Sequence, residues 1–112
     1  MWVRWREDMI ISFSSRALER AFSGDIRRLN PKVAPRIASV LAVLNAAQSI
    51  EDIEPLTGFH NLVGNRAGTC AVTITRNWRI TFVPVTEELE NPLTNEIAST
   101  FGVKSVDLDD YH

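Results

Sequence analysis

The sequence predicts an α+β fold in which two N-terminal helices pack on one face of a small antiparallel sheet. Apolar residues recur at helical spacing in the first half of the chain, and two strand-like runs flank a short turn in the second half. The last residues alternate between apolar and polar, as in a half-buried strand. Helices and strands that occupy separate parts of a chain favour helices gathered on one sheet face. The length of 112 residues fits one domain, residues 1–112.

The first half of the chain carries one strand signal and two helix signals. Residues 9–13 are apolar and predict a buried strand behind an N-terminal extension at residues 1–8. Ser14 or Ser15 is expected to cap a helix that ends at Gly24.

The second helix is expected to be the main one. Asn30-Pro31 is a helix-start signal, but Pro35 inside the helix delays the regular part until near Ala34. The helix is expected to end near Ala47. Its apolar stripe consists of Val33, Ile37, Val40, Leu41 and Leu44.

The second half of the chain predicts a hairpin and a last strand. A connecting loop covers residues 49–58, and the β-branched run at 71–75 and the run at 78–85 form the hairpin strands. Arg76-Asn77 supplies the turn, since Asn tolerates the left-handed conformation. Residues 86–102 lack a strand pattern and read as an inserted loop, and residues 103–108 form the last strand.

The charges are unevenly distributed along the chain. The net charge is −2, but residues 1–82 hold 11 Lys and Arg against 7 Asp and Glu, whereas residues 83–112 hold 1 against 7. A local basic surface can attract phosphates because binding depends on the field at the site. The alternative is a solvated charged face. A single cysteine, Cys70, forms no internal disulfide, and neither a secretory signal nor a membrane-spanning run is present, so a cytoplasmic location is expected.

Six residues are candidates for chemistry. Histidine can exchange protons near neutral pH, and an arginine in a central strand requires an anionic partner, either a protein carboxylate or a ligand phosphate. Non-functional alternatives stand beside each candidate: exposed histidines, a frayed polar tail, and an ion pair between Arg79 and a C-terminal acid. The sequence has no Cys/His cluster at metal spacing and no glycine-rich phosphate loop, so no metal site is expected. The candidates are His60, Arg66, Arg79, Asp110, Tyr111 and His112.

Residues 58–82, GFHNLVGNRAGTCAVTITRNWRITF, resemble a stretch of the HigB-type toxins of the RelE/ParE superfamily. In that stretch a His-x-Leu-x-Gly-x-Arg-x-Gly segment leads into a strand and then into Asn-Trp-Arg-Ile-x-Phe. The C-terminal Asp110-Tyr111-His112 is similar to the ending of such toxins. The resemblance covers about residues 9–85 and 103–112. The matching positions are His60, Leu62, Gly64, Arg66, Gly68, Asn77, Trp78, Arg79, Ile80 and Phe82.

The resemblance implies a RelE-like fold and ribosome-dependent cleavage of messenger RNA. It implies inhibition by a HigA-type helix-turn-helix antitoxin, through which alone the toxin would meet DNA. No metal or cofactor would be needed, because the ribose 2′-hydroxyl attacks the adjacent phosphate. His60 and His112 would transfer protons, Asp110 would orient His112, and Tyr111 would stack on a base or bond near the phosphate. Arg66 and Arg79 would hold the phosphate.

The chain also departs from the family pattern. Val63 lies where the family often has a lysine, and Thr69 and Cys70 replace a usual aromatic residue. The insertion at 86–102 and the acidic balance are further departures. A second hypothesis is therefore a non-catalytic or weakly toxic RelE-like protein that retains only antitoxin binding. A third is an unrelated α+β interaction domain.

Overall fold

The computed structural model describes residues 10–110, and this part of the chain is an α+β fold with two α-helices and a four-stranded antiparallel sheet. The predicted α+β class is confirmed. The sheet order is β1-β2-β3-β4, and each strand pairs with its sequence neighbour. The elements are α1 (Arg16–Phe22), α2 (Ala34–Ala46), η1 (Ile50–Asp52), β1 (His60–Asn61), η2 (Gly64–Arg66), β2 (Cys70–Thr73), β3 (Trp78–Glu90) and β4 (Ile97–Asp110).

Both helices begin and end close to the predicted residues. The Ser15 hydroxyl accepts a hydrogen bond of 3.2 Å from the Leu18 amide at the start of α1. Gly24 has φ of +103° just after the helix, a conformation that glycine adopts without strain. Pro35 lies in the first turn of α2, where its missing amide hydrogen has no partner to lose.

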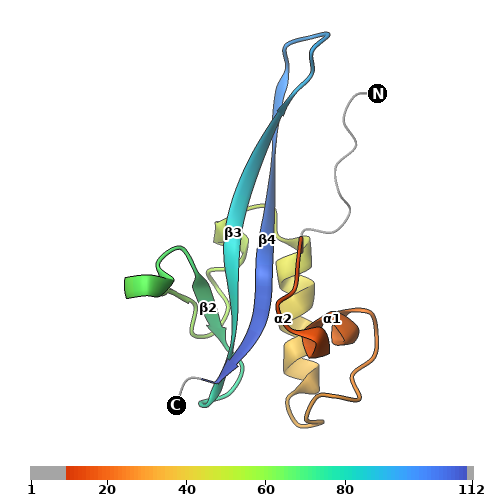
Figure 1. Cartoon of the computed structure of the whole chain (residues 1–112), viewed down its shortest axis with the longest axis vertical. Helices are drawn as coiled ribbons and strands as arrows, with labels where there is room; N and C mark the ends of the chain where they lie inside the picture. The colour runs from red at the N-terminus through yellow and green to blue at the C-terminus, as the bar shows by residue number, and fades with distance from the viewer. Residues whose placement is uncertain (1–9, 111–112) are drawn as a thin grey trace.

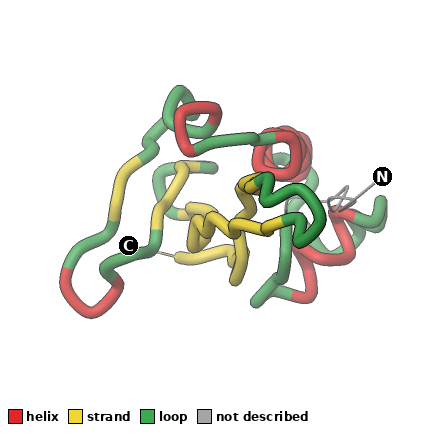
Figure 2. Tube along the Cα trace, turned by 90° about the horizontal axis from the view of Figure 1, so that it is seen from above, coloured by secondary structure: helices red, strands yellow, loops and turns green. Residues whose placement is uncertain are grey.

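The core lies between α2 and one face of the sheet. Cys70 pairs with Phe82 and Val72 with Ile80, so these four side chains share a face. They form one buried cluster with the predicted stripe of α2, of which Ile37, Val40, Leu41 and Leu44 are almost fully buried. Figures 1 and 2 show α1 and α2 together on one side of the strands, with η2 on the far side of β2.

The first predicted strand, residues 9–13, is not a regular strand in the described part of the chain. Ile10 and Phe13 form isolated parallel bridges with Val103 and Val106. β4 has a bulge relative to β3 beside this segment: Ser105 has φ of +55°, and its amide donates to the Ser12 hydroxyl at 2.9 Å. This irregular ladder explains why a continuous strand does not form. The predicted extension at residues 1–8 lies outside the described residues.

The predicted loop at residues 86–102 is wrong, because most of it is strand. β3 continues to Glu90, β4 starts at Ile97, and the two pair up to a turn at residues 91–96. Figure 1 shows this part of the hairpin, residues 86–102, which we call the arm, extending beyond the helices. β2 pairs with β3 only over Arg79–Phe82, so no described strand covers the outer edge of the arm. Side chains that pack on no core need not alternate, which is why the sequence lacks a strand pattern here.

The turn between β2 and β3 forms at the predicted place by different chemistry. Asn77 is not among the described residues with positive φ. Instead, the Thr75 hydroxyl accepts hydrogen bonds from the Asn77 and Trp78 amides at 3.3 and 3.2 Å. A threonine side chain closes the turn, so the left-handed asparagine is not required. A short strand, β1, was not predicted.

Candidate functional site

The sheet face opposite the core carries a set of polar and charged side chains. Arg79 follows Trp78 and precedes the buried Ile80, so strand alternation directs it to the other face. Thr73, Arg79 and Asp109 pair in one row across β2, β3 and β4. Directly paired residues share a face, so these three side chains lie on what we call the open face.

Two arginines converge on one carboxylate oxygen of this face. Arg79 donates to Asp109 Oδ2 from Nε and from Nη2, each at 2.9 Å. Arg66, from the distant η2 turn, donates from Nη1 to the same Oδ2 at 3.0 Å. The exposed fractions of the side chains are 15% for Arg79, 28% for Asp109 and 43% for Arg66. The alternative foreseen for Arg79, an ion pair with a C-terminal acid, is therefore present.

The ionised form of Asp109 is favoured by its partners. Partial burial raises the pKa of Asp109, but the hydrogen bonds and charges of Arg66 and Arg79 together outweigh burial and hold this pKa below its ordinary value of 3.8. Asp109 is therefore a carboxylate at neutral pH. The pair of arginines already binds an anion, and that anion belongs to the protein itself.

The position of Arg66 is set by a closed loop. Leu62 donates its amide to Thr69 at 2.9 Å, and Thr69 donates to the Arg66 carbonyl at 3.0 Å. Gly64 has φ of +73°, which permits the tight η2 turn. The loop thus folds back on itself and directs Arg66 across the open face to β4. The backbone of Arg79 is held by the ladder of the central strands, whereas the backbone of Arg66 is held by this loop.

His60 lies on the same face as the arginine pair. It pairs with Ala71, which pairs with Thr81 in the next row of the open face. Its Nδ1 lies 2.8 Å from the Gly58 carbonyl oxygen. A carbonyl only accepts, so Nδ1 carries the hydrogen, and a neutral ring keeps its lone pair on Nε2. Nε2 is therefore the atom of His60 that can take a proton from a ligand.

Gly58 is required at its position for two reasons. Its φ is +72°, and a Cβ there would overlap the hydroxyl of Thr73. Thr73 in turn donates its amide to the Thr57 carbonyl at 3.0 Å. The chain therefore passes close to β2 at Gly58, which fixes the carbonyl that orients His60.

His60 and Arg79 do not touch each other. They are one row and two strands apart, which corresponds to a Cα separation of about 12 Å. Ala71 and Thr81, which adjoin both residues on this face, are buried. The arrangement combines an anion site with a group that exchanges protons.

The C-terminal candidates are only partly described. Asp110 is exposed and pairs with Trp78, so its side chain lies on the opposite face from Arg79 and Asp109. Tyr111 and His112 lie outside the described residues. Their expected roles therefore stay predictions.

Asp109 was missed by sequence reasoning. Three acids, Asp107, Asp109 and Asp110, lie near the end of the last strand. Only the register of β3 against β4 decides which of them faces Arg79. A one-residue slip would change the answer, and the bulge at Ser105 introduces such a slip. No local signal in the sequence distinguishes the three.

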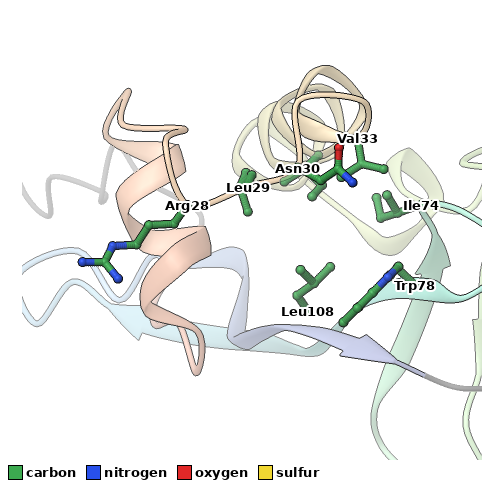
Figure 3. Close-up of a pocket in the computed structure, with 8 residues that line it drawn as sticks. Arg28, Leu29, Asn30, Val33, Ile74, Trp78 and Leu108 are labelled. Atoms are coloured by element: carbon green, nitrogen blue, oxygen red, sulfur yellow. The ribbon is translucent and has the colours of Figure 1, made fainter.

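An apolar pocket lies on the core side of the sheet, away from the open face. Its volume is about 300 Å³. Figure 3 shows Trp78 and Leu108 on one side and Val33 and Ile74 on the other, with the guanidinium of Arg28 pointing away. Trp78 is 39% exposed at its rim. The pocket offers apolar contact and no catalytic group. Its lining residues are Arg28, Leu29, Asn30, Val33, Ile37, Ile74, Trp78 and Leu108.

Within residues 10–110 no group of three or more His, Cys, Asp or Glu side chains is arranged to hold a metal ion. In the same range no helix has the length and apolar character needed to cross a membrane. No protein-family model matches the chain, and no curated protein matches it. The residues of the open face are therefore the basis for assigning a function.

Proposed function

We propose that this protein is a metal-independent endoribonuclease toxin of the HigB branch of the RelE superfamily. The observation that supports it best is that His60, Arg66 and Arg79, from three separate segments, lie on one sheet face with an anion already bound between the two arginines. They are three of the six residues that the resemblance to HigB-type toxins assigns to the site.

The reaction requires three chemical roles. The ribose 2′-oxygen loses its proton and bonds to the adjacent phosphorus, and the bond from phosphorus to the 5′-oxygen breaks, leaving a cyclic phosphate. A base removes the 2′-proton, an acid protonates the leaving oxygen, and cations stabilise the charge that develops on the phosphate. Nε2 of His60 serves one proton transfer and His112 the other. Arg79 and Arg66 bind the phosphate oxygens through N–H donors like those now directed at Asp109.

The proposed partners follow from the same assignment. The toxin acts in the cytoplasm on messenger RNA held by the ribosome. A HigA-type helix-turn-helix antitoxin inhibits the toxin. The toxin associates with DNA only indirectly, through that antitoxin. Tyr111 stacks on a base or forms a hydrogen bond near the phosphate, and Asp110 orients His112.

The test is inducible expression in bacteria with growth and primer extension on an abundant message recorded together. We expect translation-dependent cuts and growth arrest from the wild type, and neither from Arg79→Ala, His60→Ala or His112→Ala. Arg27→Ala is the matched control: Arg27 is exposed, forms an ion pair with Asp25, and lies outside the open-face rows described above. It should cut like the wild type. A folded wild type that neither cuts nor arrests growth contradicts the enzyme assignment.

A second candidate is a non-catalytic relative that retains only antitoxin binding. The observation in its favour is Val63, which is 84% exposed just before η2, where the family often carries a lysine. An exposed valine offers no phosphate contact. In the same expression experiment, Val63→Lys should then produce cuts that the wild type lacks. If the wild type already cuts, the second candidate is rejected.

A further inference from the structure

The carboxylate of Asp109 occupies the position of a ligand oxygen. Three N–H donors, two from Arg79 and one from Arg66, meet at its Oδ2 within 3.0 Å. A tetrahedral phosphate or sulfate offers oxygens with the same charge and acceptor geometry. An external oxyanion that uses both arginines must therefore compete with this carboxylate.

We propose that Asp109 is an internal anion that occupies the Arg66–Arg79 pair until a phosphate group displaces it. The site is thus closed in the ligand-free protein, and its ligand class is a phosphate ester or another tetrahedral oxyanion. That the natural ligand is the RNA backbone rests on the function proposed above. The competition between Asp109 and an external oxyanion does not depend on that function.

The exposure of the three groups indicates how displacement proceeds. Arg66 is 43% exposed and lies in a loop, and solvent-exposed ion pairs of this kind are weak. Arg79 is more buried and is fixed in a central strand. Arg66 is therefore the partner that exchanges first, while Arg79 remains as the fixed donor beneath the incoming anion.

The same geometry places a limit on ligand affinity. Asp109 is attached opposite Arg79 by the β3–β4 ladder, so its effective concentration at the pair is high and permanent. The apparent affinity for an external anion is reduced by the fraction of molecules in which the pair is open. Removing the charge of Asp109 should strengthen oxyanion binding, unlike the removal of a group that merely supports the site.

The test uses inorganic sulfate as the probe, at constant ionic strength, with the full chain and with two neutralised variants. Asp109→Asn should bind sulfate about fivefold more tightly than the wild type. Asp107→Asn is the matched control, because Asp107 pairs with Thr81 in the next row of the open face and loses the same charge. It should change the affinity less than twofold. Arg79→Gln should abolish sulfate binding both in the wild type and in the Asp109→Asn variant.

Three outcomes overturn the proposal. If a folded Asp109→Asn variant binds sulfate more weakly than the wild type, Asp109 only supports the arginines. If Asp109→Asn and Asp107→Asn strengthen sulfate binding equally, the effect comes from net charge alone. Should Asp109→Asn fail to fold, the wild type decides: saturating sulfate should shift the carboxyl carbon resonance of Asp109 and leave that of Asp107 unchanged, and no shift at Asp109 rejects displacement. Sulfate binding without RNA cleavage would leave this proposal intact and reject the ribonuclease.

Discussion

The Nε of Arg79 and the Oδ2 of Asp109 are 2.9 Å apart across the β3–β4 ladder, although the two residues are 30 positions apart in the chain. Arg66 reaches the same oxygen from 43 positions away. One carboxylate therefore connects two sheet strands and the η2 loop. This contact links the stability of the open face to its capacity to bind an anion.

The Asp109 contact makes stability depend on pH. The pKa of Asp109 is lower in the folded than in the unfolded protein, so the unfolded chain takes up the proton more readily. The stabilisation is complete above the unfolded pKa, near the ordinary value of 3.8, and is lost as pH falls through the lower folded pKa. Asp109→Asn should lower the free energy of unfolding by about 1 kcal/mol at neutral pH. Urea denaturation at several pH values should show this difference disappearing in acid. A difference that persists unchanged there contradicts the assignment.

Gly58 should tolerate no side chain. Gly58→Ala combines backbone strain at φ +72° with an overlap between the new Cβ and Thr73. We therefore expect the free energy of unfolding to fall by about 3 kcal/mol or more. Gly64→Ala is the control, because Gly64 has φ of +73° and nothing within 4 Å of the added Cβ. It should cost only about 1 kcal/mol. Chemical denaturation measures both, and equal losses would show that the close approach to Thr73 is unimportant.

The Cys70 thiol should be inert in the folded protein. It is buried, its Sγ lies 3.1 Å from the Asn61 Oδ1, and burial raises its pKa, so little thiolate forms. A chromogenic disulfide reagent at mildly alkaline pH should react roughly 100-fold more slowly with the native protein than with the unfolded chain. Asn61→Ala should remove the hydrogen bond and accelerate the reaction. Equal rates for native and unfolded protein would place the thiol at the surface.

The arm should be dispensable for folding. Of the side chains that the structure describes between Val83 and Gly102, only the partly buried Phe101 belongs to or packs against the core cluster. Replacing residues 87–100 with Asn-Gly joins Thr86 to Phe101, which already pair, through a favoured two-residue turn. The free energy of unfolding, measured by thermal denaturation, should then change by less than about 1 kcal/mol. A variant that cannot fold would show that the arm supports the core.

The two helices, the caps of α1 and the core stripe of α2 could be predicted from local sequence. Ser15, Gly24 and Pro35 act through local backbone chemistry, and the apolar spacing of α2 reflects one buried face. The hairpin around residues 76–77 could also be predicted, because its two β-branched and aromatic runs lie next to each other in the chain. His60, Arg66 and Arg79 were identified as candidates from residue type and resemblance.

Contacts between residues far apart in the chain could not be predicted in this way. The arm escaped prediction because, of the side chains that the structure describes in residues 86–102, only the partly buried Phe101 packs on the core cluster, so burial imposed no regular alternation there. The choice of Asp109 over Asp107 or Asp110 depends on register, which the bulge at Ser105 shifts by one residue. Long-range pairing sets that register through the summed packing of both strands, and no single stretch of sequence contains it.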